Sequence, residues 1–317
     1  MSQKQSIIIT GSDLAQEAVD LLQDYQLIYA GRQPGEEDMI ALCQQHNPHA
    51  IIVRYGKISA RIMDAAPALR VIAKHGSGID VIDQAAAAQR NIRVLAAPGA
   101  NAAAVAEHTW ALILACAKAV ITLDSRLREG HWDKAHHKSV ELEGRTLGLI
   151  GLGAIGSRVA RAGAAFGMQV IAYDPWAKQL PEGCELVELT TLLNRADVVS
   201  LHCPLTEQNR GMINRAALAQ LKPGAMLINT ARGGLIEEAA LADALQDGTL
   251  RCAALDSFAQ EPLTAPHRWQ QLDNVILSPH IGGVSDTSYI KMGCAAASNV
   301  LSVLQTTPSE AQAANPQ

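Results

Sequence analysis

The sequence lacks the features that mark secreted proteins. Its six cysteines are scattered and include no CxxC pair, so no disulfide framework is indicated. The stretch 1–30 carries Asp13, Glu17, Asp20 and Asp24 in place of the apolar core of a signal peptide. We therefore expect a cytoplasmic chain with free thiols.

An excess of one charge is also missing. The net charge is −5 and charges of both signs are interspersed, so there is no basic stripe for nucleic acid and no polybasic run for a membrane surface. What the chain does have is length and apolar content. Its 317 residues, 48% of them hydrophobic, are enough for two well-buried domains. Small molecules are the partners this composition favours.

One apolar segment, 102–121, is as long as a membrane span. Glu107, His108 and Lys118 fall within it, and polar groups find partners in a protein interior but not in lipid. No second span accompanies the segment. We expect a long helix that is buried between domains or subunits.

Short apolar runs alternate with helical patterns along most of the chain, which predicts doubly wound parallel sheets in two α/β domains. A turn at Pro98–Gly99 marks the first boundary, and a long apolar helix at 286–304 is expected to return to the first domain. The predicted domains are 1–99 plus 284–317, and 100–283; the polar tail 306–317 is expected to be disordered. The predicted strands are 6–10, 26–30, 49–53, 71–75, 92–95, 146–150, 169–173, 196–200, 225–229, 252–256 and 274–277.

A dinucleotide-binding fingerprint lies at mid-chain, where Gly151, Gly153 and Gly156 stand between a predicted strand and a predicted helix. The first glycine permits a tight turn, the second lets a pyrophosphate approach the backbone, and the third allows close packing. Asp174 ends the next strand, where an acid binds the adenosine ribose hydroxyls and repels a 2′-phosphate. This pattern predicts NAD, although an ordinary glycine turn and a turn-forming Asp174 before Pro175 stay as alternatives.

Three side chains follow later strands, at the carboxyl ends where doubly wound sheets bind ligands. Arg232 could grip a carboxylate through two hydrogen bonds and polarise a neighbouring carbonyl. His280 suits proton transfer, and Glu261 could accept a hydrogen bond from its ring and stabilise the imidazolium. The alternatives are a surface arginine, a surface Glu-Pro turn and a capping histidine.

Other candidates carry weaker signals. His131, His136 and His137 lie close together without cysteine or carboxylate ligands at a metal spacing, so a solvated loop is favoured over a metal site. Cys203 has no identifiable base beside it, which favours packing over a nucleophilic role. Glycines flank Ser77, and their amides could either bind an anion or form a plain turn.

Taken together, the chain from about Ile51 to Tyr289 resembles the D-2-hydroxyacid dehydrogenase family. Seven ordered motifs carry the likeness: Lys74–Asp80, Ala104–His108, the Gly151 fingerprint with Tyr173–Pro175, His202–Thr206, Asn229–Gly234, Ala254–Asp256 with Glu261–Pro262, and Ser278–His280. The resemblance implies a Rossmann NAD domain inserted into a discontinuous flavodoxin-like substrate domain. It also implies a homodimer and NAD-dependent interconversion of a small 2-hydroxy acid and its 2-oxo acid.

The resemblance further assigns roles to residues. It makes Arg232 the group that orients the substrate, His280 the acid/base and Glu261 its partner, and it implies that Asp256 meets the nicotinamide carboxamide. Substrate binding falls to Ser77, Gly78 and Arg54, and Arg54 matches a position that binds a phosphorylated or acidic substrate in phosphoglycerate dehydrogenases. The other cofactor contacts that it implies are Gly151, Gly153, Ile155, Gly156, Asp174, Cys203, Pro204, Thr230, Ala231, Gly282 and Gly283.

Within the family the chain is closest in pattern to phosphoglycerate dehydrogenases and hydroxypyruvate reductases, and we expect it to lack the C-terminal regulatory domain that many of the former carry. It departs from the family pattern at Val81, where Asn is frequent, and at Ser257, where Val is usual. Two other functions stay open: a non-enzymatic NAD-sensing scaffold, and a formate dehydrogenase, which would want glutamine in place of Glu261.

Overall fold

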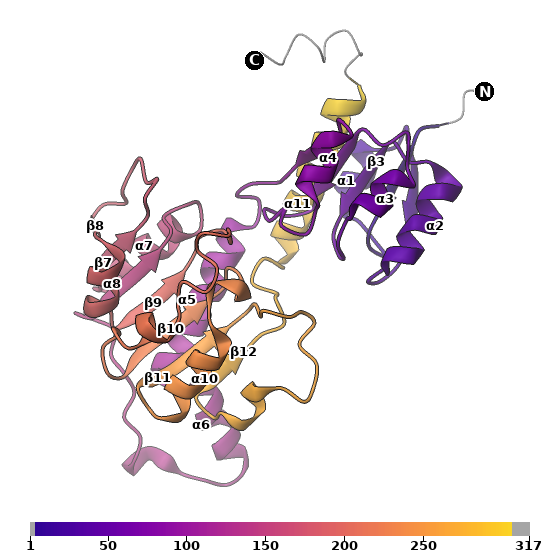
Figure 1. The fold of residues 1–317 in the computed structure, drawn as a ribbon. Coiled ribbons are helices and arrows are strands. Elements are labelled where there is room, and N and C mark those ends of the chain that lie inside the picture. The colour runs from indigo at the N-terminus through magenta and orange to yellow at the C-terminus, as the bar shows by residue number, and fades with distance from the viewer. Residues whose placement is uncertain (1–3, 306–317) are drawn as a thin grey trace. The chain divides into compact units, whose positions relative to one another are not determined.

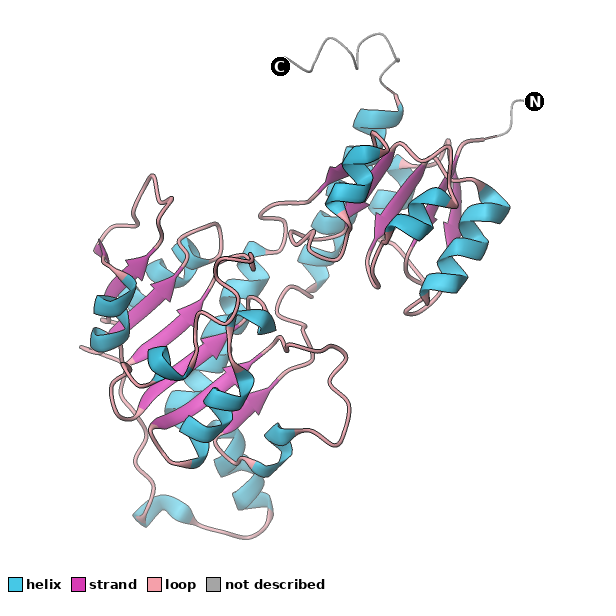
Figure 2. Cartoon of the chain, in the orientation of Figure 1, coloured by secondary structure: helices cyan, strands magenta, loops and turns pink. Residues whose placement is uncertain are grey.

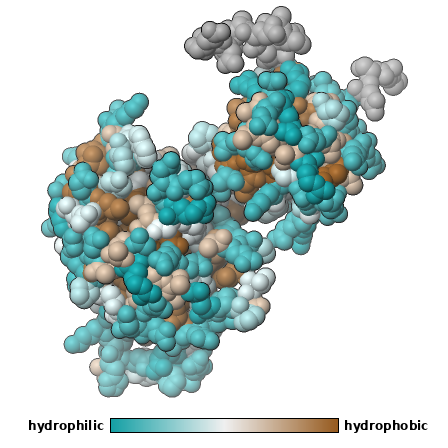
Figure 3. Space-filling model, in the orientation of Figure 1, coloured by the Kyte–Doolittle hydropathy of each residue, from teal (hydrophilic) through white to brown (hydrophobic). Residues whose placement is uncertain are grey.

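A computed structural model describes residues 4–305, so the predicted disordered tail 306–317 lies outside the described residues. The chain divides into two compact units. Unit 1 combines Met1–Asn101 with Val284–Gln317, and unit 2 is Ala102–Gly283. Hydrophilic side chains cover much of the face drawn in Figure 3, with smaller hydrophobic patches among them.

Unit 1 is built on a parallel five-stranded sheet with the order β2-β1-β3-β4-β5. Apolar residues cover both faces of this sheet, so the central strands β1 and β3 are buried along their whole length. The strands are β1 (Ser6–Ile9), β2 (Gln26–Tyr29), β3 (Ala50–Val53), β4 (Val71–Lys74) and β5 (Arg93–Leu95). This order is that of flavodoxin-like folds.

Five helices flank the sheet of unit 1 (Figure 1). They are α1 (Gln16–Leu21), α2 (Glu36–His46), α3 (Ala60–Asp64), α4 (Gln84–Gln89) and α11 (Asp286–Leu304). The last helix packs against α1 and β4, and Gly293 allows the close approach because a Cβ there would lie 3.2 Å from the Ala18 Cβ. Helix α11 has the bounds that the sequence predicts, and it completes the core of the first unit.

Unit 2 is built on a parallel seven-stranded sheet with the order β12-β11-β10-β9-β6-β7-β8. The order reverses between β6 and β9, which is the switch point where Rossmann folds bind ligands. The strands are β6 (Thr146–Ile150), β7 (Gln169–Tyr173), β8 (Cys184–Leu186), β9 (Val198–Leu201), β10 (Ala225–Asn229), β11 (Leu250–Leu255) and β12 (Val275–Leu277). The predicted fold class, two doubly wound parallel sheets, is confirmed.

Helices cover both faces of this sheet as well (Figure 2). They are α5 (Ala102–Lys118), α6 (Val120–Arg128), α7 (Gly156–Ala165), α8 (Leu189–Arg195), α9 (Arg215–Leu218) and α10 (Glu238–Gln246). Short 3-10 turns lie at Asp133–Ala135, Gly233–Leu235 and Arg268–Gln271.

The long helix predicted over 102–121 is broken. Helix α5 is largely buried, but it ends at Lys118, because Ala119 takes a positive φ of 50° and starts a new helix. Val120 and Ile121 are more than half exposed. Among the described residues no single helix is long and apolar enough to cross a membrane; α5 and α6 would pass only as a pair, bent by 60°.

The other differences from the predicted elements are small. The edge strand β8 was not predicted, since its three residues are partly exposed and carry no alternating pattern. Strand β9 begins at Val198, two residues later than predicted, and β11 begins at Leu250, two residues earlier. Predicted strands elsewhere agree to within one residue.

Candidate active site

The predicted dinucleotide loop joins β6 to α7 at the switch point of unit 2. Gly151 takes a φ of 101°, and a Cβ there would lie 2.8 Å from the Cys203 amide nitrogen. A Cβ at Gly156 would lie 2.0 Å from the Gly151 carbonyl oxygen. Gly153 differs, because a Cβ would meet no described atom within 4 Å. With Ile155 as the N-cap of α7, the loop leaves space at the helix N-terminus and fits a pyrophosphate there.

Asp174 lies beside this loop, at the carboxyl end of β7. Its Oδ2 accepts from the Leu152 amide at 2.8 Å and its Oδ1 accepts from the Trp176 amide at 2.9 Å. A carboxylate offers about four lone-pair sites, so it keeps acceptor capacity beyond these two bonds. The structure thus brings Asp174 to the glycine loop of the fingerprint.

The loop after β9 packs against the same glycines. His202 is neutral, because burial of its ring lowers its pKa to about 3. Its Nε2 lies 2.9 Å from the Ser200 Oγ, and its Nδ1 has no described partner. Burial raises the pKa of the Cys203 thiol to about 11, so the thiol is protonated near neutral pH and a packing role fits it best. The Pro204 carbonyl accepts from Asn209.

Arg232 follows β10 in a loop with a tightly bonded backbone. Asn229 accepts from the Ala231 amide at 3.0 Å and donates to the Arg232 carbonyl at 2.9 Å. The Thr230 hydroxyl lies 2.9 Å from the Thr109 hydroxyl on α5. The half-buried guanidinium of Arg232 donates to the Ala231 carbonyl at 2.8 Å. This framework fixes the loop while leaving a planar cation at the carboxyl end of the sheet.

His280 and Glu261 meet, as predicted. The His280 Nδ1 lies 2.7 Å from the Glu261 Oε2, and the Glu261 Oε1 accepts from the Phe258 amide at 2.9 Å. Burial alone would raise the pKa of Glu261, but the hydrogen bonds from His280 and Phe258 and the charge of Arg232 lower it overall. The carboxylate therefore stays ionised. With Nδ1 engaged, Nε2 is left to exchange a proton, and the imidazole side chain is 45% exposed.

Asp256 anchors the loop that carries His280. It is 2% exposed, and it accepts from the Ser278 hydroxyl at 2.6 Å, the Ile281 amide at 3.0 Å and the Gly282 amide at 2.8 Å. A buried carboxylate needs such partners, and here they hold both sides of His280. Asp256 therefore serves the structure of the site whatever else it contacts.

His108 completes this network, and sequence reasoning gave it no role. Its Nε2 lies 3.1 Å from the Ser278 Oγ and 3.4 Å from the Asp256 Oδ1. The available signal was a histidine inside a mostly apolar helix. The sequence could not predict its partners. Asp256 lies 148 positions further along the chain, and Ser278 lies further still.

The predicted substrate residues lie in unit 1. Arg54 follows β3 and Ser77 follows β4, and these strands are neighbours, so both residues lie at one edge of the sheet. The Ser77 hydroxyl donates to the Ala97 carbonyl and to the Asn101 Oδ1, each at 3.2 Å, which pins the loop that contains Gly78.

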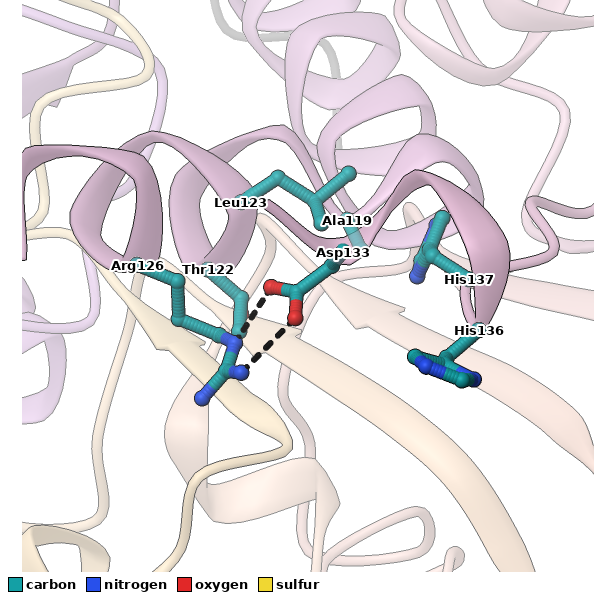
Figure 4. Close-up of a pocket in the computed structure, with 7 residues that line it drawn as sticks. All are labelled: Ala119, Thr122, Leu123, Arg126, Asp133, His136 and His137. Atoms are coloured by element: carbon teal, nitrogen blue, oxygen red, sulfur yellow. Dashed lines mark hydrogen bonds and ion pairs between the residues drawn. The ribbon is translucent and has the colours of Figure 1, made fainter. Parts of the chain in front are cut away.

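The histidine-rich loop after α6 borders a pocket of about 180 Å³ (Figure 4). Arg126 and Asp133 form a bidentate pair across it, with bonds of 2.5 and 2.8 Å, and His136 and His137 line it. Within residues 4–305, no group of three or more His, Cys, Asp or Glu residues could hold a metal ion.

Comparison with known proteins identifies the family. Residues 110–282 match the model of the D-isomer specific 2-hydroxyacid dehydrogenase NAD-binding domain, which spans more than half of the chain. The chain belongs to the D-isomer specific 2-hydroxyacid dehydrogenase family. The resemblance drawn from the ordered motifs is thereby confirmed.

Three similar proteins illustrate the likeness. A hydroxypyruvate reductase from Thermotoga maritima is 40% identical over 88% of this chain and 92% of its own. A D-3-phosphoglycerate dehydrogenase from Mycobacterium tuberculosis is 38% identical over 93% of this chain, which spans only 56% of that protein. The crystal structure of the TT0316 protein from Thermus thermophilus is 35% identical, with a TM-score of 0.88 over 95% of this chain and 97% of that one.

The two departures from the dehydrogenase pattern have different surroundings. Ser257 is 3% exposed, and its hydroxyl has no described hydrogen-bond partner beside the buried Asp256. Val81 is half-buried and packs at the edge of the unit 1 core. Nothing in the structure explains the serine.

Proposed function

We propose that the protein is an NAD-dependent oxidoreductase that interconverts a small 2-hydroxy acid and its 2-oxo acid. The observation that carries the proposal is the His280–Glu261 hydrogen bond, formed within electrostatic reach of Arg232 in the same unit as the glycine loop. An acid/base, a carboxylate that holds it and a carboxylate-binding cation are what reduction of a 2-oxo acid requires.

In reduction, Arg232 binds the substrate carboxylate and polarises the carbonyl. Protonated His280 donates from Nε2 to the carbonyl oxygen, while Glu261 holds Nδ1 and stabilises the imidazolium. The bound NADH supplies the hydride. Asp256, through the Ile281 and Gly282 amides, keeps His280 at the site, although the backbone there has a φ of 54°.

Unit 2 is the proposed NAD domain. The space beside Gly153 takes the pyrophosphate, and Asp174 takes the ribose hydroxyls and selects NAD over NADP by repelling a 2′-phosphate. Asp256 is proposed to meet the nicotinamide carboxamide. The remaining proposed contacts are Gly151, Ile155, Gly156, Cys203, Pro204, Thr230, Ala231, Gly282 and Gly283.

Unit 1 is the proposed substrate domain, with Arg54, Ser77 and Gly78 as its contributing residues. The substrate is a small molecule, not a nucleic acid or a membrane, since the charges of the chain are interspersed. The six free cysteines suit a reducing, cytoplasmic compartment.

We also propose a homodimer formed through unit 2. Helix α6 has no buried residue, and its apolar side chains Val120, Ile121 and Leu127 are 51%, 54% and 55% exposed. Trp132, in the loop that follows, is 76% exposed. An exposed apolar surface of this kind is typical of an interface between subunits.

The test is NADH oxidation with hydroxypyruvate, glyoxylate, pyruvate and phosphohydroxypyruvate, repeated with NADPH and with a His280→Ala variant. We expect at least one 2-oxo acid to be reduced, with NADH preferred. The variant should turn over about 100-fold more slowly or worse, while its affinity for NADH, measured by calorimetry, is unchanged.

Four outcomes would contradict parts of this proposal. Full turnover by His280→Ala would remove the acid/base role, and a strong preference for NADPH would remove the role of Asp174. No oxidation with any 2-oxo acid would favour the NAD-sensing scaffold. NADH production from formate would instead favour a formate dehydrogenase.

A further inference from the structure

Unit 1 contains a polar pocket of about 500 Å³ that is lined by Ser12, Asp13, Arg32, Gln33, Arg54 and Tyr55. These residues come in pairs from the carboxyl ends of β1, β2 and β3, three neighbouring strands of the sheet. Ligands of doubly wound sheets bind at this end of the strands. The pocket mixes two guanidinium groups with one carboxylate, so its charges decide what it can hold.

Arg54 is held rigidly in this pocket. Its guanidinium carbon lies 5.2 Å from the ring centroid of Tyr55 and 5.0 Å from that of Tyr289, and its side chain is only 10% exposed. The backbone of Gly11 closes another side, since a Cβ there would lie 3.1 Å from the Arg54 Cδ. Two aromatic faces stabilise the cation and fix its direction.

Asp13 forms an ion pair with the guanidinium of Arg54. The Arg54 Nη1 donates both to the Asp13 carboxylate and to the Asp13 carbonyl, and within residues 4–305 Asp13 is the only residue that accepts from the Arg54 side chain. The Tyr289 hydroxyl donates to the same carboxylate at 2.7 Å, and this bond, followed by the Arg54 contact, lowers the pKa of Asp13. The carboxylate is therefore ionised near neutral pH, although it is 63% exposed.

The ring of Tyr289 is itself held in place by a contact with His75. Its ring packs on the His75 imidazole with the centroids 5.5 Å apart, and His75 is 9% exposed at the end of β4. The phenol can therefore keep its hydroxyl on Asp13 and its face on Arg54 at the same time. The ion pair is part of a built cluster and not a chance surface contact.

We infer that Asp13 is a specificity-determining residue, which makes this pocket accept a substrate whose non-reacting end is an uncharged hydroxyl and reject one that ends in a phosphate. The inference rests on the proposed function, because it takes the pocket as part of the substrate site. Among the 2-oxo acids that members of the family could use, the inference favours hydroxypyruvate-like acids as the substrate.

The reason is electrostatic. A phosphate dianion that approaches Arg54 meets the Asp13 carboxylate on the same guanidinium, and like charges at hydrogen-bonding separation repel strongly. A hydroxyl group carries no charge and can both donate to Asp13 and accept from a cation. Arg32 contributes a positive charge close enough to lower the pKa of Asp13, but it is exposed to solvent, which weakens its pull on an anion.

The experiment compares kcat/KM for hydroxypyruvate and for phosphohydroxypyruvate in the full-length protein and in an Asp13→Asn variant. We expect the wild type to favour hydroxypyruvate. Asp13→Asn keeps the size of the side chain but removes its charge, so the ratio should move toward phosphohydroxypyruvate by about tenfold or more, mainly through KM. Tyr289→Phe, which keeps both ring contacts, should move it less in the same direction.

The chain offers a matched control in Asp64→Asn. Asp64 is 62% exposed and forms an ion pair with Arg90 at 2.7 Å, but it lies on α3, outside the pocket. This variant should leave the ratio unchanged. A ratio that is equal in the wild type and Asp13→Asn, or that moves as far in Asp64→Asn, would overturn the inference.

A second measurement separates this inference from the proposed function. Calorimetric binding of inorganic phosphate needs no turnover, and Asp13→Asn should bind phosphate at least about tenfold more tightly than the wild type does. If no 2-oxo acid is reduced but this gain is seen, the proposed function fails while the charge selection by Asp13 stands. If reduction is seen without the gain and without a change in the substrate ratio, only the inference fails.

Discussion

At the scale of single residues, the chemistry of this protein depends on side chains whose charge is set by one or two neighbours. Glu261 stays ionised because His280 and the Phe258 amide outweigh its burial, and Asp13 stays ionised because Tyr289 and Arg54 donate to it. His75 shows the opposite case. Burial lowers its pKa to about 4 from an ordinary value of 6.5, so the folded protein holds it neutral.

This neutral histidine predicts a pH-dependent stability. The unfolded chain binds a proton at His75 below about pH 6.5, whereas the folded chain does so only near pH 4, so stability is lost as the pH falls between these values. The loss reaches about 3 kcal/mol by pH 4. Urea unfolding of the wild type and His75→Gln from pH 7.5 to 4 measures it.

The variant should be less stable than the wild type at pH 7.5 and should lose less stability as the pH falls. His131→Gln is the control, because that side chain is 51% exposed and its replacement should leave the pH dependence unaltered. Parallel curves for the wild type and His75→Gln would show that His75 is not the group responsible.

At the scale of the elements, the glycine loop between β6 and α7 separates two uses of glycine. Gly156 has no room for a side chain, since a Cβ would lie 2.0 Å from the Gly151 carbonyl oxygen, whereas Gly153 faces open space. Gly156→Ala should therefore lower the free energy of unfolding by about 3 kcal/mol or more. Gly153→Ala should change stability by less than about 0.5 kcal/mol.

Gly153→Ala should instead affect the binding of the cofactor. A methyl group at position 153 fills the space that we assign to the pyrophosphate, so Gly153→Ala should bind NADH at least about tenfold more weakly while remaining folded. Titration of NADH followed by the fluorescence of Trp176, which is 80% exposed beside Asp174, measures the affinity. A Gly153→Ala variant with unchanged affinity would place the pyrophosphate elsewhere.

The elements that could be predicted from the sequence are those with a local cause. Buried runs such as Thr146–Ile150 and Ala225–Asn229 have the bounds expected from their apolar residues and the turns that follow. The break at Ala119 was not predicted, because alanine favours helix and nothing near it signals a left-handed residue. Edge strand β8 was not predicted either, because none of its three residues is buried and the sequence therefore shows no alternation of apolar and polar residues there.

The candidate site follows the same division. The carboxyl ends of strands could be found from the sequence, and Arg232 and His280 do follow the ends of β10 and β12. The pairing of His108 with Asp256 and of Asp13 with Tyr289 could not, because each joins residues separated by more than a hundred positions. Only the folded sheet order decides which loops meet.

At the scale of the whole molecule, the exposed large apolar side chains of the described residues include four on α6 and the loop after it, Val120, Ile121, Leu127 and Trp132. Leu127 is 55% exposed on a helix without a buried residue. If two copies bury this surface symmetrically, each copy contributes the same leucine, so one substitution acts twice. Burial of a leucine side chain is worth about 1.5 kcal/mol or more, which gives about 3 kcal/mol for the pair.

Leu127→Glu should therefore weaken self-association by about a hundredfold or more. Sedimentation velocity at micromolar concentration should show the wild type at twice the mass of the 33.7 kDa chain and this variant shifted to the single chain. Leu180→Glu is the matched control: that leucine is 47% exposed in the loop between β7 and β8, away from α6, and the variant should remain dimeric. A monomeric wild type would contradict the proposed dimer, and dimers in both variants would move the interface to another surface of unit 2.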